Sequence, residues 1–152
     1  MVSYKTYLPE YSDLTVPELN LSTPILRAGS RQLGTYCDTQ SKEFMLCRME
    51  NDADPRKCLK EGAELTQCGI EFFQKVKANC REEFEKFAYC TEHSSGELYI
   101  YPCRKQLRKW EYCALDKLGI QTPQLGYFCR PHVHVTDRPK PELPTHRDYE
   151  AE

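Results

Sequence analysis

Eight regularly spaced cysteines constrain the fold of this chain more than any other feature. Each consecutive pair has nine residues between its members, and the eight are Cys37, Cys47, Cys58, Cys68, Cys80, Cys90, Cys103 and Cys113. The pattern therefore occurs four times within residues 35 to 119, a segment that contains only two prolines. An internal repeat with so few helix breakers predicts helical units, two to a hairpin, and an all-α fold.

The spacing excludes a disulfide between the two cysteines of one unit. Ten helical steps separate them by about 15 Å along the helix axis and leave both on the same half of the helix. A disulfide requires Cα atoms within about 7 Å of each other, so Cys80 cannot bond Cys90. Two antiparallel helices with matching spacing solve the problem, because the first cysteine then faces the last and the two inner cysteines face each other.

Turn-forming residues indicate which helices pair. The stretch "MENDADPRKC" offers a break with Asp54 as N-cap and Pro55 as first helical residue, and "TEHSSGELY" offers a serine and a glycine before the next helix. The segment "GIEFFQKVKAN" has only Gly69 as a breaker. Hairpins are therefore expected to close at residues 51 to 54 and 92 to 96. This predicts four disulfides, Cys37–Cys68, Cys47–Cys58, Cys80–Cys113 and Cys90–Cys103.

Two alternatives stay open at this point. A nested four-helix arrangement with Cys58–Cys90 and Cys68–Cys80 bonds also satisfies the spacing. The first helix of the first hairpin is the least certain, because three polar residues that suit an N-cap follow Cys37 directly or closely and would start the helix only after that cysteine. These are Asp38, Thr39 and Ser41.

Apolar side chains are expected between the two disulfides of each hairpin. In the second hairpin these would be Phe84 and Phe87 opposite Leu107 and Trp110, and in the first Phe44 would meet Leu65. Hairpins of this size bury too little surface to stay folded on burial alone. Closing a loop of about 32 residues removes about 3 to 4 kcal/mol of unfolded-state entropy, and the inner loop of about 12 residues adds less.

The organisation predicted for the whole chain has four parts. Residues 1 to 34 form an N-terminal arm, which Gly29 and Gly34 interrupt and in which Thr23 and Pro24 open one short helix. Residues 35 to 72 and 73 to 119 are the first and second hairpins. Residues 120 to 152 contain five prolines and form an extended tail. Both arms are expected to lie on partner proteins, because they have no core of their own.

Composition excludes several classes of protein. The formal charge of -2 and the isoelectric point near 6.1 provide no basic footprint for nucleic acid. With a mean hydropathy of -0.71, no window approaches the roughly 20 apolar residues of a membrane-spanning helix. The N-terminal stretch "MVSYKTYLPEYSDL" lacks the features of a secretory signal and of an Arg-rich transit peptide, so we expect no cleavable targeting segment.

The cysteines do not have the spacing of a metal or redox site. Structural zinc sites usually contain two cysteines two to four residues apart, copper carriers need near-adjacent thiols, and thiol oxidoreductases need a Cys-x-x-Cys motif. Cys129 with His132 and His134 resembles a metal cluster, but it lacks a fourth ligand and is expected to be a thiol in the tail. The runs "REEFEK" and "CRKQLRKWEYC" are typical of a solvated helix face. We expect no metal, no cofactor, no catalytic residue and no enzymatic activity.

The four-fold pattern resembles the twin coiled-coil-helix-coiled-coil-helix proteins of the mitochondrial intermembrane space. "KEFMLCR", "DPRKCLKEG", "CRKQ", "LDKLG" and "TDRPKPELP" are similar to the PGIV-type accessory subunits of mitochondrial respiratory complex I (NADH:ubiquinone oxidoreductase). The resemblance covers about residues 20 to 144.

The resemblance implies a non-catalytic scaffold on the intermembrane-space face of the membrane arm of complex I. Its partners would be other complex I subunits, and it would be peripheral to the inner membrane and needed for assembly or stability. It also implies import by the oxidative thiol relay of that compartment, which would recognise Cys80 with Phe73 and Val76 before it and Phe84 and Phe87 after it. The alternative in another class is an assembly factor or metal-delivery protein of the same compartment.

Overall fold

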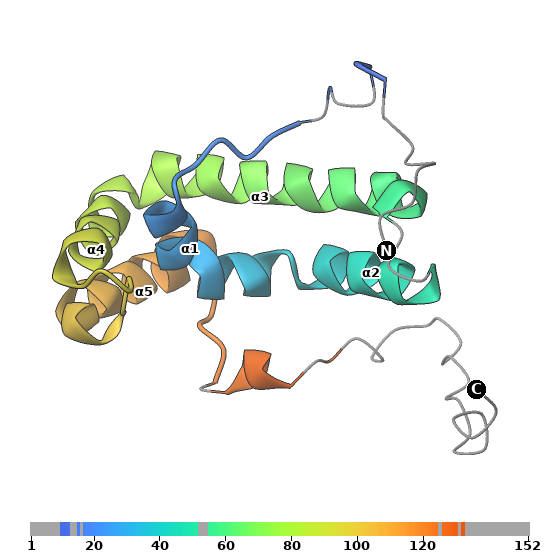
Figure 1. Cartoon of the computed structure of the whole chain (residues 1–152). Helices are drawn as coiled ribbons and strands as arrows, with labels where there is room; N and C mark the ends of the chain where they lie inside the picture. Colours follow the sequence, from blue (N-terminus) through green and yellow to red (C-terminus); the bar gives the residue numbers. More distant parts are fainter. Residues whose placement is uncertain are drawn as a thin grey trace.

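The predicted all-α fold is confirmed by a computed structural model of the chain, which describes residues 10–12, 15, 17–51, 55–124, 126–130 and 132. Within these residues every regular element is helical (Figure 1). Asp54, the predicted N-cap, lies outside them. The α-helices are α1 (Thr23–Tyr36), α2 (Asp38–Glu50), α3 (Leu59–Asn79), α4 (Arg81–Ser94) and α5 (Arg104–Leu118), and the short 3-10 helices are η1 (Pro55–Cys58), η2 (Tyr101–Cys103) and η3 (Tyr127–Cys129).

The cysteine repeat is also a repeat in backbone conformation. The first cysteine of each unit is the N-cap of a helix, with φ between -131° and -98° and ψ between 22° and 28°, and the second lies inside that helix. The helix that begins after Cys37 is thus the rule for all four units. The nine residues between the two cysteines of each unit are helical. The two cysteines are therefore too far apart along the helix axis to form a disulfide with each other.

The helices form two hairpins, and the longest helix, α3, belongs to the first and also packs against the second. In Figure 1, α1 and α2 follow each other alongside α3, while α4 and α5 lie together at the far end of α3. The helix α2 packs on α3, and α4 packs on α5. The helix α3 is 21 residues long and continues through residues 72 and 73. Gly69 does not interrupt it, and a Cβ there would lie 3.4 Å from the side chain of Leu19.

The main hydrophobic core belongs to the second hairpin, α1 and the C-terminal half of α3. Its buried members are Ala28, Phe72, Val76, Cys80, Phe84, Phe87, Ala88, Cys103, Trp110, Cys113, Ala114 and Ile120. The first hairpin contributes little beside its cysteines, since α2 buries only Leu46 and Cys47. Burial therefore stabilises the second hairpin far more than the first.

The short helix expected to open at Thr23 and Pro24 is α1, which starts one residue after its N-cap Ser22 and is part of this core. The helix packs against α4 and α3, and Gly29 is buried in its interior. A Cβ on Gly29 would lie 3.0 Å from two ring atoms of Phe73. The glycine is needed for close helix packing, and only the tertiary structure reveals that role.

We expect Gly29→Val to lower the free energy of unfolding by about 1 to 3 kcal/mol, because the added side chain would overlap a ring that is packed against two other aromatic rings. The ring of Phe73 is held between Phe72 and Phe84, at centroid distances of 5.0 and 6.0 Å. Gly34→Val is the matched control on the same helix. Its Cβ would meet only the ring tip of Phe128, which is 50% exposed and can turn into solvent.

Chemical denaturation of the two glycine variants measures the difference. Both replacements have the same effect on intrinsic helix propensity, so this contribution cancels in the comparison. Equal losses of stability in the two variants would mean that α1 is not packed closely against Phe73.

Candidate interaction surfaces and the disulfide framework

Four disulfides connect the helices of the two hairpins. The structure pairs Cys37 with Cys68, Cys47 with Cys58, Cys80 with Cys113, and Cys90 with Cys103, and the Cα–Cα distances are 5.9 to 6.0 Å. Each hairpin thus has an outer disulfide near its open end and an inner one near its turn. The sequence separations are 31 and 11 residues in the first hairpin and 33 and 13 in the second.

The space between the disulfides is filled differently in the two hairpins. In the second, the rings of Phe84 and Trp110 meet edge to face at 5.0 Å between centroids, and Phe87 is fully buried. In the first, Phe44 lies against the backbone of α3, where a Cβ on Gly62 would be 3.3 Å from its ring. The aromatic packing expected from the sequence is thus strongest between α4 and α5.

A polar clasp joins α1 to α5 and to the beginning of the C-terminal segment. One guanidinium nitrogen of Arg31 lies 3.0 Å from a carboxylate oxygen of Glu111, and the other donates to the carbonyl of Pro123. Gln32 is fully buried and donates to the hydroxyl of Thr122. Residues 120 to 123 therefore lie on the protein itself, a contact that the proline-rich sequence did not reveal.

Two lysines near the first hairpin have a raised pKa. The hydrogen bond from Lys42 to Asp38, one turn earlier in α2, raises the pKa of Lys42 despite some desolvation. The hydrogen bond from Lys75 to the hydroxyl of Tyr36, 2.6 Å away, raises the pKa of Lys75. Both ammonium groups stay charged at neutral pH and connect neighbouring turns or helices.

The three residues considered as a metal cluster, Cys129, His132 and His134, are only partly described. Cys129 is an exposed free thiol at the end of η3. The ring of His132 stacks on Tyr127 at 4.7 Å between centroids, and His134 lies outside the described residues. No group of three or more His, Cys, Asp or Glu side chains in the described part of the chain is arranged to hold a metal ion.

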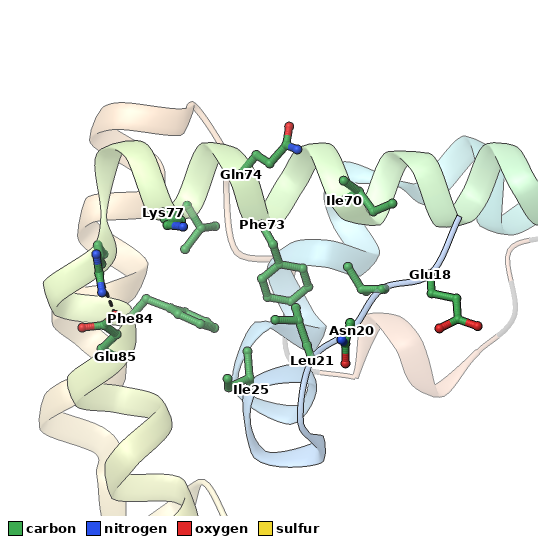
Figure 2. A pocket seen from close by; sticks show the side chains of 13 residues that line it. Glu18, Asn20, Leu21, Ile25, Ile70, Phe73, Gln74, Lys77, Phe84 and Glu85 are labelled. Carbon is green, nitrogen blue, oxygen red and sulfur yellow. Dashed lines mark hydrogen bonds and ion pairs between the residues drawn. The ribbon is translucent and has the colours of Figure 1, made fainter. Parts of the chain in front are cut away.

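An apolar groove opens where the N-terminal segment crosses α3 beside α1 and α4. Its volume is about 350 Å³, and Figure 2 shows Leu21, Ile25, Ile70, Phe73 and Phe84 pointing toward it. Charged side chains surround this apolar floor, among them the Arg81–Glu85 ion pair at 2.7 Å. An apolar floor with a charged rim is the composition common at contacts between subunits.

None of the helices in the described part of the chain is long and apolar enough to cross a membrane.

Comparison with known proteins gives two similar curated proteins from Arabidopsis thaliana, while no family model matches the chain. They are named NADH dehydrogenase (ubiquinone) 1 alpha subcomplex subunit 8-A and subunit 8-B. Each is 26% identical to the chain over 90 residues, which are 59% of this chain and 81% and 82% of the two relatives. The resemblance seen in the sequence is confirmed: the chain is similar to alpha subcomplex subunit 8 of NADH dehydrogenase, and its four disulfides fit the twin-hairpin pattern.

Proposed function

We propose that this protein is a non-catalytic accessory subunit of mitochondrial respiratory complex I that acts as a structural scaffold on the membrane arm. The observation that carries the proposal is the similarity over four fifths of two proteins named as subunits of NADH dehydrogenase. The partners would be other subunits of that complex. The chain would contribute contact surface, and it would support assembly and stability instead of catalysis.

The disulfide framework supports a scaffold role physically. The four disulfides restrict how the helices move relative to one another, and the clasp between Arg31 and Glu111 fixes α1 on the second hairpin. A surface that is rigid before binding loses less conformational entropy when it docks. A small chain can therefore bind larger partners tightly without a large core of its own.

The proposed location is the intermembrane space, with import through the oxidative relay of that compartment. The support is the set of apolar side chains around Cys80: Val76, Phe84 and Phe87 are buried in the folded protein, so they would be accessible to a relay only before folding. Protease treatment of mitochondria tests the location. The chain should be protected in intact organelles and digested once the outer membrane is opened.

Co-migration with complex I tests the subunit proposal. A tagged chain is expressed in place of the native subunit, membranes are extracted with a mild detergent, and complexes are separated by native electrophoresis. The tag should co-migrate with NADH dehydrogenase activity in the mature complex. A tag found only on smaller assembly intermediates would contradict the proposal and favour an assembly factor of the intermembrane space.

A further inference from the structure

The first half of α5 has an exposed basic face. Arg104, Lys105, Arg108 and Lys109 lie within six residues and are all exposed. The whole chain has 21 Lys and Arg against 23 Asp and Glu, so this concentration of positive charge is local. The next acidic residue, Glu111, is paired with Arg31 of α1. The sequence suggested an ordinary face of mixed charge, but the structure removes its nearest carboxylate from that face.

The helix does not need these cations for its own stability. The positive end of the helix dipole lies at the N-terminus, where it disfavours cations and favours carboxylates. The helices α2, α3 and α4 follow this rule, with Asp38, Glu61 and Glu82 in their first turns. The first turn of α5 contains no acidic residue and begins with Arg104 and Lys105. The positive charges at the start of α5 are thus opposite to those that the helix dipole favours there.

Exposed tyrosines border the basic face. Tyr101 and Tyr112 are 70% and 72% exposed, and the guanidinium carbon of Arg104 lies 3.9 Å from the centroid of the Tyr101 ring. Tyr89 of α4 is also largely exposed and lies with Lys105 and three other α5 residues along one shallow hollow. Cationic and amphipathic aromatic side chains therefore share this surface.

The neighbouring helix offsets only part of the positive charge of this face. Glu83 and Glu85 of α4 border the hollow, but Glu85 is already paired with Arg81 at 2.7 Å. Lys86, beside them, is held by Glu82 at 3.1 Å. Among the described residues, none of the four basic side chains of α5 forms an ion pair.

We propose that the basic face of α5, with its bordering tyrosines, lies on a surface of anionic phospholipid headgroups. Cations attract such a surface with a contribution from each charge, and tyrosine rings prefer the boundary between headgroups and acyl chains. Four exposed cations without ion-pair partners in the described part of the chain, three of which line an open hollow, fit a fluid layer of anions, because such a layer needs no matched geometry and each cation adds to the attraction. The proposal rests on the proposed function, which brings the chain to the inner membrane.

Vesicle binding of the full-length oxidised protein tests this proposal without complex I. The probes are vesicles of phosphatidylcholine alone and of phosphatidylcholine with phosphatidylglycerol, separated by flotation. The variant R104Q/K105Q/R108Q/K109Q removes the basic face. The matched control R27Q/K57Q/K60Q/K77Q removes four exposed cations from other helices and gives the same net charge. Circular dichroism establishes that both variants are folded.

The native chain should bind the anionic vesicles and not the neutral ones, and binding should weaken as salt screens the charges. The α5 variant should lose about tenfold or more of its partition coefficient, while the control keeps most of it. Equal losses in both variants would reduce the effect to net charge and overturn the proposal. The proposal would also be overturned if the α5 variant bound anionic vesicles as well as the native chain but failed to co-migrate with complex I. That result would assign the basic face to contact with an acidic protein.

The two proposals fail in different ways. A native chain that co-migrates with complex I but ignores anionic vesicles would overturn the lipid contact and leave the subunit proposal intact. A chain that binds vesicles through α5 but is absent from complex I would overturn the subunit proposal and leave the lipid contact intact.

Discussion

Replacing the four cysteines of the first hairpin with alanine should abolish hydrogen-exchange protection in α2 while α4 and α5 stay protected. The change removes the disulfides Cys37–Cys68 and Cys47–Cys58. Loss of the outer disulfide alone restores about 3 to 4 kcal/mol of unfolded-state entropy. A helix of 13 residues whose only buried aliphatic side chain is Leu46 cannot compensate, because helices of this length are marginal without packing.

The second hairpin provides the matched comparison. Its disulfides close loops of nearly the same length, 33 and 13 residues against 31 and 11, so chain entropy predicts nearly equal effects. Burial predicts different effects for the two hairpins, because α4 and α5 contain much of the main core. Removing Cys80–Cys113 and Cys90–Cys103 should therefore lower the stability of the whole core together, instead of releasing one helix. Exchange read by mass spectrometry distinguishes local from global opening.

Replacing the free thiol gives the control for this experiment. Cys129→Ser should leave the protection pattern unchanged, since the residue is exposed and unpaired with another cysteine. If α2 kept its protection without both disulfides, covalent bonding would not be what holds the first hairpin.

Replacing Trp110 with alanine should lower the free energy of unfolding by about 3 to 5 kcal/mol, the range for large buried aromatic residues. The side chain is fully buried and packs against Phe84 in the layer between the two disulfides of the second hairpin. The cavity would lie between α4 and α5, which the disulfides prevent from collapsing freely. Denaturant titration with the disulfides intact measures the loss.

Two further variants identify the origin of the loss at Trp110. Its indole N–H has no hydrogen-bond partner among the described residues, so Trp110→Phe should be much milder, at about 1 to 2 kcal/mol, because it removes an unpaired donor along with some volume. Tyr112→Ala changes an aromatic residue on the same helix that is 72% exposed, and it should stay within about 0.5 kcal/mol of the native protein. Similar losses at residues 110 and 112 would contradict the described core.

The sequence predicted the hairpins because their constraint is covalent geometry. Spacing along a helix and the reach of a disulfide are local quantities that a sequence displays directly. The first cysteine of each unit was harder to place, since a cysteine is not a usual N-cap. The structure shows that the repeated backbone turn at Cys37, Cys58, Cys80 and Cys103 comes with the disulfide framework and not with a capping side chain.

The role of α1 could not be predicted because it depends on tertiary contacts. A glycine in a helix lowers helix propensity, and Gly29 gave no sign that a ring would lie against it. The ion pair between Arg31 and Glu111 joins residues 80 positions apart. The charge run in α5 looked mixed in the sequence because it contains Glu111, whose pairing with α1 only the structure shows. The surface character of α5 follows from a distant pairing.

Mapping the disulfides of the native protein tests the central claim, which is that each hairpin is closed by its own two disulfides. The free thiol of Cys129 is first alkylated, and digestion proceeds without reduction near about pH 6, where thiolates are scarce and exchange is slow. Trypsin alone leaves Cys90 and Cys103 in one peptide, because no Lys or Arg lies between them. Cleavage after glutamate must be added, since Glu92 and Glu97 separate the two.

We expect four linked pairs of peptides: QLGTYCDTQSK with LTQCGIE, FMLCR with CLK, ANCR with YCALDK, and FAYCTE with LYIYPCR. A link between CLK and FAYCTE, or between LTQCGIE and ANCR, would instead reveal bonds between the hairpins and contradict the account.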